Sequence, residues 1–119
     1  MGSGRLDNGE WLLVGNSIFS DDGSVELRMQ DDGKLAVYYD DECKWQNTAE
    51  QRGDIHGVKM QGDGNFVMYS DSGTGTATWH TDTASPTGQG STYVAVQDDG
   101  NVVVYNNSDR AIWATDTYR

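Results

Sequence analysis

The chain has 119 residues, enough for one domain with a modest hydrophobic core. Its net charge of −11 argues against binding to nucleic acid or to an anionic membrane surface, because phosphate recognition needs clustered Lys and Arg. Fifteen Gly, one Pro and many Val, Thr, Tyr and Trp predict an all-β fold with tight turns. The sequence contains no apolar run of 18 residues, which a membrane-spanning helix would need. The composition is compatible with a neutral ligand.

The first segment of the chain predicts short strands. Residues 1–4 (M-G-S-G) look like a cloning remnant, so residues 5–119 are the single predicted domain. From Leu6 to Phe19, Leu and Gly recur at steps of three, and Gly is too frequent for a helix. Strand fragments joined by turns fit this segment better. Trp11 has no counterpart later in the chain and is predicted to lie on the surface.

A hairpin pattern then occurs three times, at residues 25–38, 58–69 and 93–105. Each copy is an apolar-rich run, a D-D-G or G-D-G break and a second apolar-rich run. This pattern predicts an antiparallel hairpin whose Gly takes positive φ in a bulged turn. Gln30, Gln61 and Gln97 mark the copies, 31 and 36 residues apart, which indicates a repeat architecture.

Each hairpin is followed by a predicted third strand carrying one Trp. The first turn is predicted at Asp40 to Lys44, and the linkers between units at residues 50–57 and 84–91. The second unit is predicted to pair Val58 to Gln61 with its next strand and to turn at residues 70–75. One small sheet cannot bury its own apolar face, so three must pack together. We expect a triangular arrangement with the three repeat tryptophans pointing inward: Trp45, Trp79 and Trp113.

The third unit shows which chemistry the repeat could carry. Strand alternation places Asn101, Val103 and Tyr105 on one face and Val102 and Val104 on the core face. The side chains of the preceding Gln and of the Asp in the turn should lie over the first of these faces. Mixed amide, carboxylate and phenol groups with an aliphatic patch suit the hydroxyls of a neutral polyol. The set contains no nucleophile–base pair.

The repeated pattern Q-x-D-x-N-x-V-x-Y resembles the mannose-site motif of the monocot bulb lectins, the snowdrop-agglutinin-like family. The second and third units match it in full, with Gln61, Asp63, Asn65, Val67 and Tyr69, and with Gln97, Asp99, Asn101, Val103 and Tyr105. The tails W-H-T-D-T and W-A-T-D-T and the opening L-x-x-G-x-x-L are also similar to the family. The resemblance covers nearly all of residues 5–119.

This resemblance implies a β-prism II fold with three antiparallel sub-sheets around a pseudo-threefold axis. It further implies a non-catalytic lectin that needs no cofactor or metal and binds terminal α-mannose on high-mannose glycans and glycoproteins. In such a site Asp and Asn would hold the axial 2-hydroxyl, Gln would assist at the 3-hydroxyl, Tyr would reach the 4-hydroxyl, and Val would pack on the ring. Family members also dimerise through their C-terminal strands, so a homodimer is a further expectation.

The first unit departs from the family pattern. It keeps Gln30, Asp32 and Tyr38, but Lys34 stands in place of Asn and Ala36 in place of Val. Lys offers only donors and a charge, so an impaired mannose site is expected there.

The cysteines also differ from those of the plant family. The two positions of the plant family's disulfide align with Gly33 and His56, which leaves Cys43 as the single cysteine. The chain therefore resembles the cysteine-poor relatives found outside plants or in the cytoplasm. The location expected is cytoplasmic or secreted, with the cytoplasm slightly favoured by the single cysteine and by the absence of a signal-peptide pattern.

Three other functions are alternatives to sugar binding. Calcium binding is disfavoured because the D-G turns lack the ligand spacing of EF-type loops. A hydrolase with paired carboxylates does not explain two copies of one site. The serious rival is a β-prism II protein-interaction module, or a lectin-like antimicrobial protein, that acts without mannose.

Overall fold

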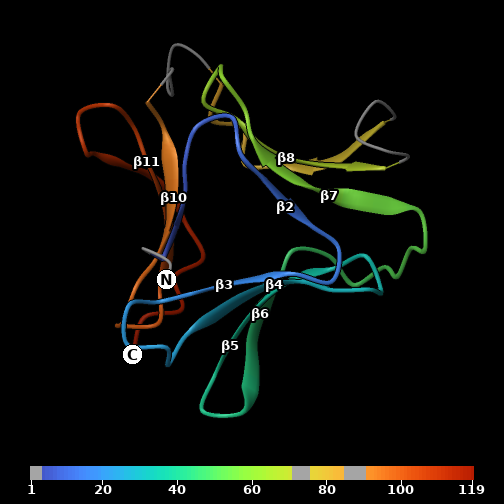
Figure 1. Ribbon diagram of the computed structural model, residues 1–119, viewed down its shortest axis with the longest axis horizontal. Helices are drawn as coiled ribbons and strands as arrows, with labels where there is room; N and C mark the ends of the chain where they lie inside the picture. The colour runs from blue at the N-terminus through green and yellow to red at the C-terminus, as the bar shows by residue number, and fades with distance from the viewer. Residues whose placement is uncertain (1–3, 71–75, 85–90) are drawn as a thin grey trace.

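The computed structural model describes residues 4–70, 76–84 and 91–119. In these ranges the chain forms twelve strands, arranged as three four-stranded antiparallel sheets that enclose a common centre (Figure 1). This confirms the predicted β-prism II fold with its three sub-sheets. Part of the turn expected at residues 70–75 and most of the linker expected at 84–91 lie outside the described residues.

The first sheet has the order β3-β4-β5-β6, with β3 Ser17–Phe19, β4 Glu26–Met29, β5 Leu35–Tyr39 and β6 Glu42–Gln46. The turn predicted from Asp40 to Lys44 was too long. Asp40 and Asp41 alone make it, with φ of 55° and 61°. Two consecutive left-handed residues close a hairpin in two residues, and Asp tolerates this conformation better than most side chains. The strand that carries Trp45 therefore begins at Glu42.

The second sheet has the order β2-β7-β8-β9, with β2 Trp11–Leu13, β7 Ile55–Met60, β8 Phe66–Ser70 and β9 Ala77–His80. The linker predicted at residues 50–57 was too long, because β7 already begins at Ile55. The register shifts between Ile55 and Gly57, so the apolar alternation is interrupted at His56. This irregularity hid the start of the strand in the sequence.

The third sheet has the order β1-β10-β11-β12, with β1 Arg5–Leu6, β10 Tyr93–Val96, β11 Val102–Tyr105 and β12 Ala111–Ala114. The hairpin and the Trp113 strand lie where the sequence predicts them. Gly4 precedes β1 with a positive φ of 68°, and its carbonyl oxygen accepts a hydrogen bond of 2.7 Å from the Val96 amide.

The N-terminal segment serves all three sheets. Its strands β1, β2 and β3 pair with β10, β7 and β4, so each is the first strand of a different sheet. Figure 1 shows this blue segment crossing from one sheet to the next. The repeat predicted three strands per unit, and the fourth comes from this one shared segment.

The core confirms the predicted triangle of tryptophans. The ring centroids of Trp45, Trp79 and Trp113 lie 5.7 to 6.0 Å apart, each pair edge-on. The three rings are partly buried and pack against a buried hydrophobic cluster that includes Phe66. Trp11 lies apart from this triangle, against His56 and Tyr69.

The three hairpin turns adopt the predicted bulged conformation. Gly33, Gly64 and Gly100 have φ of 86°, 93° and 97°. In each turn the Gly amide donates to the carbonyl oxygen of the motif Gln three residues earlier. The sequence pattern thus determines the backbone on which the motif side chains are mounted.

Gly57 allows a close approach between two strands of the second sheet. A Cβ atom there would lie 2.5 Å from the Leu12 carbonyl oxygen. We expect Gly57→Ala to lower the free energy of unfolding by about 1–3 kcal/mol, because β2 must move to make room. Urea denaturation of the variant measures this. Gly53→Ala is the matched control, since nothing lies within 4 Å of its Cβ position, and equal losses in both variants would contradict the steric explanation.

Candidate mannose sites on the sheet faces

The second hairpin brings its motif side chains to the outer face of the second sheet. The Gln61 Nε2 donates a hydrogen bond to the Tyr69 hydroxyl, which joins the two ends of the motif. The Asp63 carboxylate accepts from the backbone amide of Asn65 at 3.0 Å, an interaction that fixes the turn. Val67 lies between these groups and is buried outside the main core cluster, so it forms the floor of the site.

Asn65 is oriented by the T-D-T tail that follows Trp79. Its Oδ1 accepts hydrogen bonds from the Thr83 amide at 3.1 Å and from the Thr81 hydroxyl at 3.4 Å. Asp82 has a left-handed φ of 60°, which turns the chain back toward Asn65. With its oxygen engaged, Asn65 can offer its Nδ2 to a ligand, and this atom lies 3.2 Å from His80 Nδ1.

The third hairpin repeats this geometry. Gln97 Nε2 donates to the Tyr105 hydroxyl at 2.6 Å, and Asp99 accepts from the Asn101 amide at 2.9 Å. The Asn101 Oδ1 accepts from the Thr117 amide at 3.3 Å. One neighbour differs between the sites, since Ala114 stands where the second sheet has His80. Apart from the contact between Asn65 and His80, the two full motifs therefore present the same donors and acceptors in the same arrangement.

The threonines of the T-D-T tails are positioning residues that sequence reasoning missed. Besides contacting the motif Asn, Thr83 and Thr117 each donate through Oγ1 to the carbonyl of the turn glycine, at 2.7 and 2.6 Å. In each tail the two threonine hydroxyls also bond to each other at 2.7 Å. The signal was present in the sequence as a tail repeated at the same place, but its role needs the fold to be seen.

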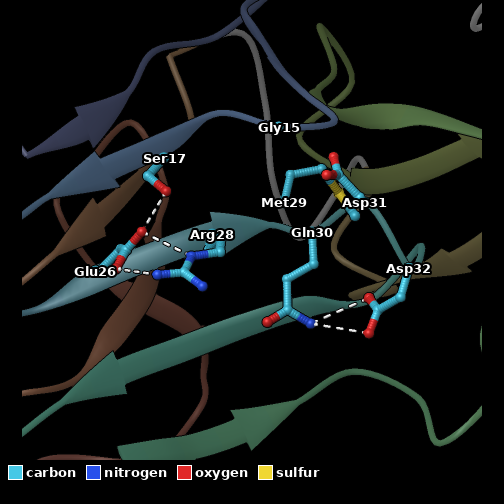
Figure 2. A pocket seen from close by; sticks show the side chains of 8 residues that line it. All are labelled: Gly15, Ser17, Glu26, Arg28, Met29, Gln30, Asp31 and Asp32. Carbon is cyan, nitrogen blue, oxygen red and sulfur yellow. Dashed lines mark hydrogen bonds and ion pairs between the residues drawn. The ribbon is translucent and has the colours of Figure 1, made fainter. Parts of the chain in front are cut away.

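The first hairpin holds its motif residues differently. Tyr38 donates to the Gln30 Oε1, and Gln30 Nε2 donates to Asp32 at 3.1 and 3.4 Å, as Figure 2 shows for the Gln30–Asp32 pair. The amide of Gln30 is thus reversed relative to the other two sites and occupies the Asp carboxylate. Ala36 is fully buried.

The first unit also lacks the tail that orients Asn in the other sheets. Asn47 takes the place of the first tail threonine, and its Oδ1 accepts from the Leu35 amide at 2.9 Å. The bond has its counterpart in the second sheet, where the Thr81 hydroxyl accepts from the Phe66 amide at 3.2 Å. The residues after Asn47 do not continue as Asp-Thr, so the local scaffold for a motif Asn is incomplete here.

Cys43 is exposed and forms no disulfide. The His56 ring packs edge-on against Trp11, with 5.0 Å between the ring centroids. Within residues 4–70, 76–84 and 91–119, no group of three or more His, Cys, Asp and Glu side chains is placed to hold a metal ion. The same residues contain no helix of the length and apolarity needed to cross a membrane.

Comparison with known proteins links this geometry to solved structures. Neither the family models nor the curated sequences give a match. Among solved structures, a monomeric monocot mannose-binding lectin from Gastrodia elata is 36% identical over 98% of this chain and 100% of its own, with a TM-score of 0.82. A Marasmius oreades lectin is 35% identical over 96% and 91% of the two chains, also with a TM-score of 0.82. The mannose-specific agglutinin of snowdrop, solved with methyl α-D-mannoside, is 32% identical over 98% of each chain, with a TM-score of 0.73.

Three sheets, each with a Gln-Asp-Tyr face at its hairpin, define a protein of the β-prism II lectin class. At more than 30% identity across nearly the whole of both chains, the chain belongs to the monocot mannose-binding lectin family. The resemblance found in the sequence is thereby confirmed.

Proposed function

We propose that this protein is a non-catalytic lectin that binds terminal α-mannose through the outer faces of its second and third sheets. The observation that carries the proposal is the matched geometry of the two full motifs, each with a Gln–Tyr bond and an Asn held by its T-D-T tail. A snowdrop relative of the same fold was solved with methyl α-D-mannoside, which supports the ligand.

The fixed bonds leave the groups that a mannose ring needs. The second carboxylate oxygen of each motif Asp can accept from the axial 2-hydroxyl, while the motif Asn donates to the same hydroxyl through Nδ2. The Tyr hydroxyl accepts from Gln, so its own proton is available for the 4-hydroxyl. Val67 and Val103 provide the apolar floor. These groups bind and orient a sugar, and we propose no reaction.

The affinity for a single sugar should be low. A shallow site that contacts one ring is expected to bind with a dissociation constant of roughly 1 mM, or about −4 kcal/mol. Two sites on one chain allow branched high-mannose glycans and glycoproteins to be held by avidity. Homodimer formation would add further sites and stays a prediction, since the Gastrodia relative is described as monomeric. A cytoplasmic location likewise stays a proposal.

Residue-resolved NMR titration with methyl α-mannoside tests the proposal, with methyl α-glucoside as the control. Amide shifts confined to residues 61–69 and 97–105, and absent with the glucoside, are the expected result. The first hairpin should respond weakly or not at all. An absence of shifts at tens of millimolar mannoside, about ten times the expected dissociation constant, would refute monosaccharide recognition and favour the protein-interaction module.

Restoring the first site is a constructive test of the same proposal. We expect Lys34→Asn with Ala36→Val to give only a small gain, because the new Asn would lack its T-D-T support. Adding Asn47→Thr, Thr48→Asp and Ala49→Thr should raise the mannoside response of the first hairpin to about that of the second, near 1 mM. The same titration measures both variants. Equal gains in both would show that the tail threonines do not position the Asn.

A further inference from the structure

The outer face of the first sheet carries its own set of side chains. Phe19 pairs with Glu26 and Glu26 with Tyr38, while Ser17 pairs with Arg28. Because side chains alternate along a strand, these five residues lie on the same face of β3, β4 and β5. Four of them lie toward the β3 edge of the sheet, and the fifth, Tyr38, belongs to the incomplete mannose motif of this sheet.

The other two sheets hold different residues at the positions of Glu26 and Arg28. In the second sheet these are Gly57 and Lys59, and in the third they are Tyr93 and Ala95, as the strand registers show. The acid–base pair is therefore peculiar to the sheet whose mannose motif is incomplete.

Glu26 and Arg28 form a rigid polar unit. Arg28 donates to the two carboxylate oxygens of Glu26 through Nε at 2.9 Å and Nη2 at 3.0 Å, and the Ser17 hydroxyl donates to Glu26 at 2.5 Å. The Arg28 guanidinium lies 4.6 Å from the centre of the Tyr38 ring. Figure 2 shows the remaining guanidinium nitrogen pointing away from Glu26. Side chains already held in place lose little entropy when a ligand binds.

The two charges persist at neutral pH. Burial raises the pKa of Glu26, but the hydrogen bonds from Arg28 and Ser17 outweigh it and hold the pKa below its usual value. The Glu26 side chain is 17% exposed and that of Arg28 is 46% exposed, so both can be reached from solvent. The pair presents a carboxylate acceptor and a free guanidinium donor side by side, which is the combination that sugar hydroxyls require.

Two clefts meet at this pair. One, of about 450 Å³, extends past Ser17 to Gln30 and Asp32 and is drawn in Figure 2. The other, of about 360 Å³, extends past Tyr38 to Phe19. Each has the volume of a small-ligand site, and both share Glu26 and Arg28 as their common wall. A ligand that fills both must be longer than one sugar ring.

The rims of the clefts indicate the chemistry of the ligand. Phe19 is 49% exposed, which gives an aromatic surface for the apolar face of a sugar ring. Asp31 and Asp32 line the first cleft, and Asp40 and Asp41 line the second. Four carboxylates around one ion pair repel an acidic ligand.

We propose that this face, the Glu26–Arg28 site, binds a neutral oligosaccharide of two or more rings, with one ring on Phe19 and hydroxyls on Glu26 and Arg28. The site borders the incomplete motif of the first hairpin, whose Gln30, Asp32 and Tyr38 line its two clefts. It does not depend on mannose binding by the second and third sheets. The protein would then recognise two different features of a glycan.

The test uses a background in which the motif sites are silenced, Asp63→Asn with Asp99→Asn. Tetramers of this variant are applied to arrays of neutral and acidic oligosaccharides. We expect neutral oligosaccharides to remain bound, and Arg28→Gln and Phe19→Ser each to weaken that binding at least tenfold. Amide shifts on adding the best-bound glycan should fall at residues 17–28. Arg5→Gln, which removes an exposed Arg from the third sheet, is the charge-matched control and should leave binding unchanged.

Three outcomes would overturn the proposal: no neutral oligosaccharide bound by the background variant, a preference for acidic glycans, or equal effects of Arg28→Gln and Arg5→Gln. Each variant is first checked for a native NMR spectrum, and the exposure of Phe19 and Arg28 makes folding defects unexpected. Failure here is distinct from failure of mannose binding. The latter is read from the mannoside titration of the unmodified protein, at residues 61–69 and 97–105.

Discussion

Replacing Trp79 with Ala is expected to lower the free energy of unfolding by about 3–5 kcal/mol. Its ring contacts Trp45 at 6.0 Å, Trp113 at 5.8 Å and Phe66 at 6.1 Å between centroids. Each edge-on aromatic pair contributes about 0.5–1.5 kcal/mol beyond the area it buries. Because the Trp79 ring is partly exposed, we expect a value toward the lower end of the range.

Urea denaturation measures this loss, and Trp11→Ala is the control. Trp11 lies outside the triangle, where its ring meets His56 and Tyr69, so its removal should cost less than about 1.5 kcal/mol. Comparable losses for the two variants would mean that the triangle does not hold the three sheets together. A loss below about 1 kcal/mol for Trp79→Ala would have the same meaning.

Replacing Asp99 with Asn is expected to remove mannoside binding at the third sheet and to leave the second unchanged. The Asn side chain keeps an oxygen to accept from the Asn101 amide, so the turn is preserved, but the charged acceptor for the sugar is lost. Hydrogen bonds to charged groups contribute about 1.5–3 kcal/mol, which corresponds to a roughly ten- to hundredfold weaker dissociation constant.

NMR titration reports both sites of this variant at once, so residues 61–69 serve as an internal control. Asn101→Ala should also abolish the third site. It removes, in addition, the side-chain oxygen that accepts hydrogen bonds from the Thr117 amide and the Thr115 hydroxyl. That variant is therefore expected to lose about 1 kcal/mol of stability, whereas Asp99→Asn should lose little. A full mannoside response at residues 97–105 in Asp99→Asn would show that the Asp does not contact the sugar.

Local sequence was sufficient for the hairpins and for the face of the strand on which each side chain lies. The D-D-G and G-D-G breaks predicted the positive φ of Gly33, Gly64 and Gly100, because only Gly takes that conformation without a Cβ penalty. Period-two alternation placed Val102 and Val104 in the core, where they are found. Both are consequences of short-range geometry.

The strand limits that were missed depend on exceptions to these local rules. Asp40 and Asp41 close a two-residue turn that a Gly would normally mark, and an irregular register at His56 breaks the alternation of β7. Neither the two-residue turn nor the irregular register can be predicted from a residue and its near neighbours. The tertiary structure decides them, because the strand opposite has to be in place.

The sequence by itself determined the three repeated hairpins and their motifs, since each depends on residues close together in the chain. It also determined the inward tryptophans, because three equivalent sheets can bury their apolar faces only against one another. Only the tertiary structure decided that one N-terminal segment supplies β1, β2 and β3 to three sheets, because pairing of distant strands leaves no local periodicity. It also decided that Thr83 and Thr117 hold the motif Asn, and that Glu26 and Arg28 lie between two clefts. Contacts between segments 16 or more residues apart are set by the packing of the sheets, which the pattern of each segment does not contain.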